Sequence, residues 1–173
     1  MNKKVVSLAH AAVIAALYVV LTFVANSLGL ASYAIQVRFS EALTILPFFT
    51  PAAIPGLFIG CLLSNILTGC MPLDILFGSL ATLLGALGTY LLCGRAKASA
   101  QAKPTKIWLA PLPPILANTL IVPFVLAYVY QFEGSIPYFM VTVGVGEILS
   151  CGVLGMMLLK ALQRYRKYIF PEK

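Results

Sequence analysis

The chain has 173 residues, of which 61% are hydrophobic and only 10% are charged. Its mean hydropathy is +0.97, and a water-soluble domain of this size could not bury so much apolar surface. A helix needs about 20 apolar residues to cross a bilayer, so the length leaves room for about five to seven crossings and for no soluble catalytic domain. The composition therefore predicts one integral membrane domain over residues 1–173.

Six apolar segments predict an all-α membrane protein, a bundle of six transmembrane helices. In chain order they are residues 5–28, 34–49, 51–67, 74–93, 107–130 and 136–162. The second segment is short, and Pro47, Pro51 and Pro55 predict a tight turn between it and the third. Prolines 111, 113 and 114 crowd the start of the fifth segment, so we expect that helix to begin late or to kink.

The basic residues predict the orientation in the membrane. When six crossings are threaded from a cytoplasmic N-terminus, all of the 12 Lys and Arg residues except Arg38 fall on the cytoplasmic side. This bias follows the positive-inside rule and predicts that both termini and the basic loop at about residues 94–106 are cytoplasmic. It also accounts for the net charge of +7, so the charge gives no reason to expect a nucleic-acid partner.

Small residues recur four positions apart, the spacing that aligns side chains on one face of a helix. In the first segment the pairs are Ala11 with Ala15 and Ala12 with Ala16. Gly56, Gly60 and Ser64 repeat in the same way in the third. Such faces let helices approach closely, and the spacing allows two interpretations. The alanines either pack inside the bundle or form a docking surface for a partner membrane protein.

Polar side chains inside a bilayer are costly, about 2.5 to 3.5 kcal/mol for a charged one at a helix centre, so they require an explanation. In the predicted helices they are Arg38, Glu41, Asn65, Asp74, Asn118 and Glu147, with Glu133 in the predicted external loop. One explanation is an ion pair between Arg38 and Glu41, three residues apart on one face. The alternative is that the polar groups converge on a ligand in the outer half of the bundle.

Four tyrosines fall at the predicted external ends of the helices: Tyr33, Tyr128, Tyr130 and Tyr138. Their rings either stack on a flat ligand or form an aromatic belt at the membrane surface. Of these, Tyr128 is a candidate ligand-binding residue.

Catalytic and metal-binding motifs are missing from the sequence. It has no HExxH helix, no GxSxG turn and no GxxxxGK[ST] phosphate loop, and its cysteines form no CxxC pair. We therefore expect no enzyme, no metal and no bound cofactor. If the protein transports uphill, either ions or another subunit must supply the energy.

Three segments resemble a known family. They are LAHAAVIAALYVVLTF (8–23), YAIQVRFSEALTILPFFTPAAIPGLFIGCLLSNIL (33–67) and PLDILFGSLATLLGALGTYLL (72–92). They are similar to the substrate-binding subunits, or S components, of energy-coupling-factor (ECF) vitamin transporters, and in particular to the queuosine-precursor transporter family QueT.

The resemblance implies a six-helix bundle of the ECF S-component type in a bacterial cytoplasmic membrane. Such a subunit captures its ligand from outside and associates with a transmembrane coupling subunit and two cytoplasmic ATPases. ATP is then hydrolysed by the partners, and the Ala11/Ala15 and Ala12/Ala16 faces are expected to contact the coupling subunit.

The implied ligand is a 7-deazaguanine such as queuine, preQ1 or preQ0. A guanine-like edge has two adjacent N–H donors that a carboxylate can accept, and a carbonyl that needs a donor. Glu41 or Glu147 suits the first role and Arg38, Asn65 or Asn118 the second, while Asp74 can pair with the ligand's amine. Another flat vitamin on the same scaffold is the alternative ligand. A membrane enzyme or a scaffold with structural acids is the alternative from another class.

Overall fold

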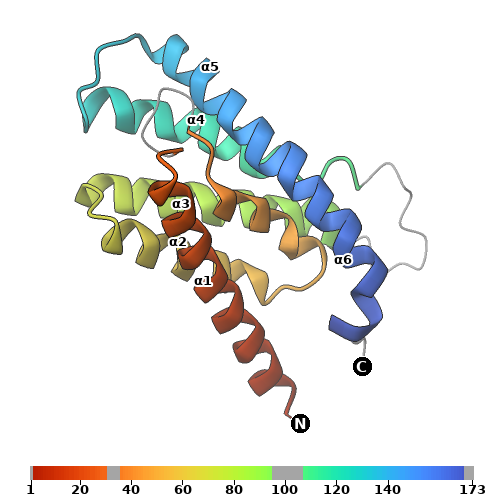
Figure 1. The fold of residues 1–173 in the computed structure, drawn as a ribbon. Helices are drawn as coiled ribbons and strands as arrows, with labels where there is room; N and C mark the ends of the chain where they lie inside the picture. Colours follow the sequence, from red (N-terminus) through yellow and green to blue (C-terminus); the bar gives the residue numbers. More distant parts are fainter. Residues whose placement is uncertain (1, 31–35, 95–106, 170–173) are drawn as a thin grey trace.

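The computed structural model describes residues 2–30, 36–94 and 107–169, and in these parts of the chain the regular structure is entirely helical. The α-helices are α1 (Lys3–Ser27), α2 (Ala53–Leu67), α3 (Pro72–Thr89), α4 (Leu112–Tyr128), α5 (Ile136–Glu147) and α6 (Met156–Ile169) (Figure 1). A 3-10 helix, η1 (Phe39–Phe48), lies between α1 and α2. Tyr33 and most of the predicted basic loop lie outside the described residues.

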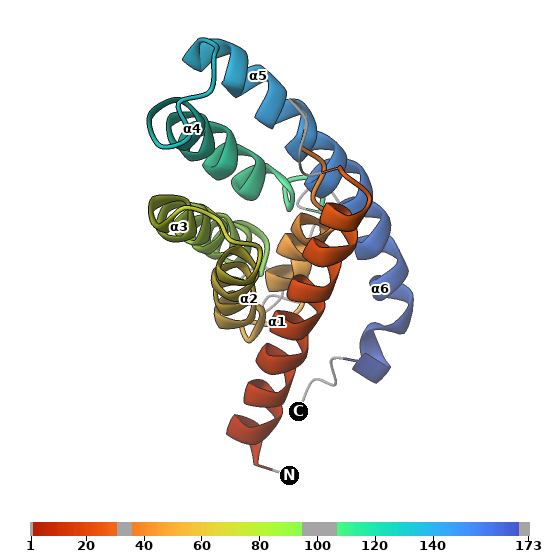
Figure 2. The same ribbon diagram turned by 60° about the vertical axis from the view of Figure 1, so that its left-hand side comes forward.

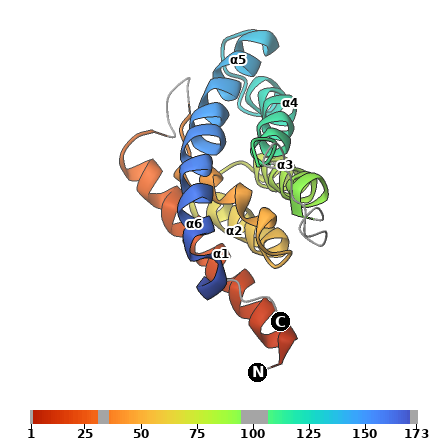
Figure 3. The same ribbon diagram turned by 90° about the vertical axis from the view of Figure 1, so that its right-hand side faces the viewer.

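Three helical stretches are long and apolar enough to cross a membrane: Lys4–Ser27, Pro72–Gly94 and Ile136–Tyr165. The second joins α3 to a π-helical turn, η2 (Tyr90–Gly94), and the third joins α5 to α6 through a π-helical segment, η5 (Ile148–Gly155). Figure 3 shows the continuous stretch of α5, η5 and α6 running along the length of the bundle. Together with the shorter apolar helices η1, α2 and α4, these spans confirm the prediction of an all-α membrane bundle.

The second predicted segment differs from a transmembrane α-helix. Its helical part is ten residues of 3-10 helix, which rise about 20 Å in total and so cannot cross about 30 Å of hydrocarbon alone. Gln36 to Arg38 precede it without regular structure. The fifth segment begins late, as predicted: α4 starts at Leu112, directly after Pro111.

Successive helices from α1 to α5 pack against one another, and η1 lies between α1, α3 and η5 (Figure 2). Residues Ser40 to Phe48 of η1 are all buried. At one end of the bundle α1 begins and α6 ends, whereas the α2–α3 and α4–α5 turns gather at the other end (Figure 1). The buried 3-10 helix thus brings polar residues into the middle of a membrane bundle.

The contact between α1 and α2 is too close for side chains at two glycines. A Cβ atom at Gly56 would lie 2.7 Å from the Ala11 carbonyl oxygen, and one at Gly60 would lie 2.7 Å from Cβ of Tyr18. Ala11 and Ala15 are each only 8% exposed, whereas Ala12 and Ala16 are exposed. The prediction of a partner surface is therefore corrected for Ala11 and Ala15, because α2 already covers them.

Candidate ligand-binding site

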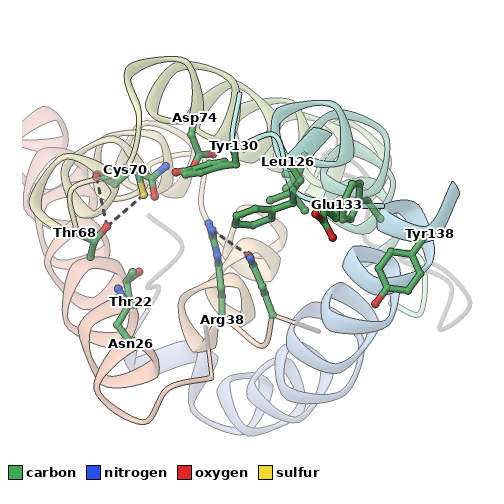
Figure 4. A pocket seen from close by; sticks show the side chains of 15 residues that line it. Thr22, Asn26, Arg38, Thr68, Cys70, Asp74, Leu126, Tyr130, Glu133 and Tyr138 are labelled. Carbon is green, nitrogen blue, oxygen red and sulfur yellow. Dashed lines mark hydrogen bonds between the residues drawn. The ribbon is translucent and has the colours of Figure 1, made fainter. Parts of the chain in front are cut away.

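A cavity of about 630 Å³, here called the outer chamber, lies at the end of the bundle that holds the α2–α3 and α4–α5 turns (Figure 4). Its polar lining includes Thr22 and Asn26 of α1, Asn65 of α2, Asp74 of α3 and Arg38 before η1. Tyr130, Phe132, Tyr138 and Phe139 supply aromatic walls. The volume lies within the range of about 300 to 1,000 Å³ that is usual for small-molecule sites.

A second cavity of about 20 Å³, the inner pocket, adjoins the outer chamber and shares Arg38 and Asp74 with it. It extends to Glu41, Asn118 and Glu147, which are 2%, 4% and 8% exposed. This volume holds about one water-sized group. A ligand in the outer chamber can therefore present a polar edge to buried side chains of three different elements.

The inner pocket contains two buried polar atoms that lack a hydrogen bond: Oε2 of Glu41 and Nδ2 of Asn118. Tyr18 donates its hydroxyl proton to the other Glu41 oxygen, Oε1. Nδ2 of Asn118 lies near both carboxylates but in hydrogen-bonding geometry with neither. Leaving such a group unpaired costs about 1 to 3 kcal/mol, so the pocket is stabilised by a ligand that offers one donor and one acceptor.

Local backbone structure places Glu147 beside Glu41. Glu147 ends α5, and the following π-helical segment places Cys151 so that its thiol donates to Oε2 of Glu147 at 3.1 Å. One residue earlier, a Cβ atom at Gly146 would collide with the backbone oxygen of Gln36. Glycine thus lets the segment before η1 lie directly against α5, which brings the two acids to the same pocket.

Arg38 and Glu41 do not form the ion pair that their spacing allows. In the described part of the chain, Arg38 has no carboxylate within 4.0 Å, and its Nη2 donates to Oε1 of Gln36 at 3.4 Å. Its backbone N–H donates to Oγ of Ser150 at 3.1 Å. The reason is that η1 begins after Arg38, whose backbone is extended, so the two side chains do not share a helix face.

Asp74 is held on the wall of the outer chamber by Tyr130, whose hydroxyl donates to Oδ2 of Asp74 at 2.8 Å. Figure 4 shows the two side by side, with Arg38 extending into the chamber. Tyr130 follows α4 in the turn toward α5, and partial burial together with the Asp74 carboxylate raises its pKa. The phenol therefore keeps its proton and remains a donor to Asp74.

Glu41, Glu147 and Cys151 each offer a ligand atom within 4.8 Å of the others, which is a spacing that can hold a metal ion. A metal would require the thiolate form of Cys151. In this structure the thiol instead donates a hydrogen bond to Glu147.

The structure brings together six of the seven residues that the sequence nominated for ligand binding. They line the two cavities and are Arg38, Glu41, Asn65, Asp74, Asn118 and Glu147. Tyr128 is the exception, because it lines neither cavity, is 70% exposed and stacks on Phe124 with 6.4 Å between ring centres. The nomination of Tyr128 is corrected: it lies on the outer surface, and Tyr130 lines the chamber instead.

The sequence interpretation missed Tyr18 and Cys151, which donate hydrogen bonds to Glu41 and Glu147. Cys151 follows Glu147 by four residues, a helical spacing that could have suggested the contact. Tyr18 carries no such signal, since it is 23 residues from Glu41. Thr22 and Asn26, also four apart, are a polar pair at the end of α1 that could have been found.

Comparison with known proteins identifies a family. The sequence profile of the QueT transporter family matches residues 8–164. A stretch of 73 residues is 38% identical to the queuosine precursor transporter QueT of Lactococcus lactis subsp. cremoris (strain MG1363), and it spans 42% of this chain and 43% of that relative. No solved structure matches the chain significantly. Since the family match covers most of its length, the chain belongs to the QueT transporter family.

Proposed function

We propose that this protein is the substrate-binding subunit of an ECF-type importer for a queuosine precursor. The observation that carries the proposal is the pair of unpartnered atoms, Oε2 of Glu41 and Nδ2 of Asn118, buried next to an open chamber of about 630 Å³. The relative from Lactococcus lactis is named for a queuosine precursor. A binding subunit, rather than an enzyme, agrees with the transporter family.

A 7-deazaguanine matches the unpartnered atoms chemically. Oε2 of Glu41 can accept from the adjacent N–H groups of the heterocycle, and Nδ2 of Asn118 can donate to its carbonyl oxygen. Glu147 provides a second carboxylate beside them. A ligand that lacks these groups would leave Glu41 and Asn118 unpaired, which disfavours it by about 1 to 3 kcal/mol for each group.

The distribution of basic residues supports an outward-facing chamber. Lys4 lies near the start of α1, and Lys160 and Arg164 lie in α6, at the end of the bundle away from the chamber. Nζ of Lys160 lies 5.2 Å from the centre of the Trp108 ring, an arrangement typical of a membrane boundary. With these residues on the cytoplasmic side of a bacterial membrane, the chamber opens outside and both termini are cytoplasmic.

A binding titration of the purified full-length protein tests the proposed ligand. The ligands are preQ1, queuine, preQ0, guanine, riboflavin and thiamine, measured by calorimetry in detergent. We expect saturable binding of at least one 7-deazaguanine and none of riboflavin or thiamine. Saturable binding of riboflavin or thiamine, with no binding of deazaguanines, would overturn the queuosine-precursor assignment and favour another vitamin.

Energy for import is proposed to come from a transmembrane coupling subunit and two cytoplasmic ATPases. The exposed Ala12 and Ala16 on α1 offer a small-residue face that a helix of the coupling subunit can approach closely.

Changing Ala16 to leucine is expected to reduce the amount of coupling subunit that co-purifies by about tenfold, because the larger side chain separates the helices. Ligand binding by the isolated subunit should be unchanged. Ala161→Leu on α6 is the control for added bulk, since Ala161 is exposed like Ala16 but lies on another helix. Normal co-purification of Ala16→Leu would exclude this face as the contact.

A further inference from the structure

The acidic residues of this basic protein are concentrated around the cavities. Four of its five acidic residues line the outer chamber or the inner pocket: Glu41, Asp74, Glu133 and Glu147. The chain has 12 Lys and Arg residues, and among the described ones only Arg38 lines a cavity. A protein with a net charge of +7 thus places most of its acidic residues around its ligand chamber.

Three of these acidic residues are buried, and they outnumber the described Lys and Arg side chains that line the cavities. Glu41, Asp74 and Glu147 are each less than 9% exposed, and within the described residues no Lys or Arg lies within 4.0 Å of them. Their protein partners are neutral donors, namely the Tyr18 and Tyr130 hydroxyls and the Cys151 thiol. Arg38 lines both cavities beside them, so the three acids outnumber the one nearby cation among the described residues, and a ligand that brings a positive charge can pair with a carboxylate that no described Lys or Arg contacts.

The acidic residues lie at different positions in the two cavities, and each position suits a different part of a ligand. Oε2 of Glu41 and Nδ2 of Asn118 are buried and unpartnered, and they suit the neutral hydrogen-bonding edge of a heterocycle. Asp74 lies where the inner pocket meets the outer chamber, since it lines both. Tyr130 donates to its Oδ2 atom, and no described residue donates a hydrogen bond to Oδ1. Oδ1 can therefore accept from a cationic group attached to the heterocycle.

We infer that the site selects a cationic ligand: a 7-deazaguanine whose side chain carries a protonated amine, held by Asp74. The inference rests on the proposed function and adds a charge requirement to it. Among the candidate precursors, preQ1 has a primary amine and queuine a secondary amine, and both are protonated at neutral pH. PreQ0 has a neutral nitrile at the same position, so the site should discriminate against it.

PreQ1 and preQ0 make a sharp test, because they share the heterocycle and differ in the charged group. In calorimetric titrations of the full-length protein, we expect preQ1 to bind about 10- to 100-fold more tightly than preQ0, as for other hydrogen bonds to charged groups. Asp74→Asn should remove most of this preference by weakening preQ1. The asparagine oxygen still accepts from Tyr130, so the variant keeps that structural contact.

Two charge variants serve as comparisons. Glu133→Gln removes an exposed carboxylate from the chamber wall and should weaken preQ1 by less than Asp74→Asn does, because solvent screens it. Lys160→Gln changes the charge at the opposite end and should leave both affinities unchanged. Equal binding of preQ1 and preQ0 by the parent, or an equal loss of both in Asp74→Asn, would overturn the charge requirement while leaving the proposed function intact. Failure to bind any of preQ1, queuine and preQ0 would overturn both.

Discussion

Replacing Glu41 with glutamine is expected to weaken ligand binding by about 100-fold, the largest effect that we predict for a single polar side chain. The substitution keeps the volume and the acceptor for Tyr18, but it replaces the unpartnered Oε2 with an NH₂ group. The N–H donors of the heterocycle would then meet a donor, and the new NH₂ would also face Nδ2 of Asn118. Calorimetric titration of preQ1 or queuine measures the loss.

Tyr128→Ala is the matched control for this prediction. Sequence reasoning nominated both Glu41 and Tyr128 as binding residues, but the structure places Tyr128 on the outer surface. The control should bind the ligand as tightly as the parent protein. If Tyr128→Ala lost affinity and Glu41→Gln did not, the ligand would occupy a different surface from the one described.

The second large effect is expected for Gly60→Ala, which should destabilise the protein by about 1 to 3 kcal/mol through overpacking. An added Cβ atom would lie 2.7 Å from Cβ of Tyr18 and 3.1 Å from the backbone of Ala15. Either α1 must move away from α2 or Tyr18 must leave its position. Because Tyr18 donates to Glu41, we also expect weaker ligand binding. Thermal unfolding in detergent, with and without ligand, measures both effects.

Gly152→Ala is the control that tests whether the destabilisation comes from the close contact between α1 and α2 or from replacing any glycine with alanine. A Cβ atom at Gly152 would make only ordinary contacts, at 3.7 Å with Ile148 and 3.9 Å with Ile115. The variant should unfold at nearly the parent temperature. Equal stability of the Gly60→Ala and Gly152→Ala variants would show that the α1–α2 contact is looser than described.

Hydrophobic patterning was sufficient to predict the membrane class and most of the helices. A helix that crosses lipid must be apolar on its exposed faces as well as its buried ones, and α1, α3 and the α5–α6 helix are therefore visible as long apolar runs. The η1 segment was not predicted as a 3-10 helix, since an apolar run of ten residues has the same composition in either helix type. In the structure this segment packs against α1, α3 and η5, and such tertiary contacts cannot be derived from the composition of the segment itself.

Sequence reasoning found most of the charged and amide residues that line the two cavities, but not how their side chains are directed. A buried charge in a membrane is costly, so Glu41, Asp74 and Glu147 could be recognised as unusual from sequence alone. The direction of each side chain could not be recognised. Tyr128 and Tyr130 differ by two positions at the end of α4, and the end of the helix turns one ring outward and the other into the chamber. Only the three-dimensional path of the turn separates them.

The central claim is that a queuosine precursor fits between Glu41, Asn118 and Asp74 in the open end of the bundle. An experimental structure of the full-length protein with preQ1 tests it most directly. We predict that the heterocycle donates to Oε2 of Glu41 and accepts from Nδ2 of Asn118, and that the amine contacts Asp74. A structure that shows preQ1 bound elsewhere, with Glu41 and Asn118 still unpartnered, would contradict the account.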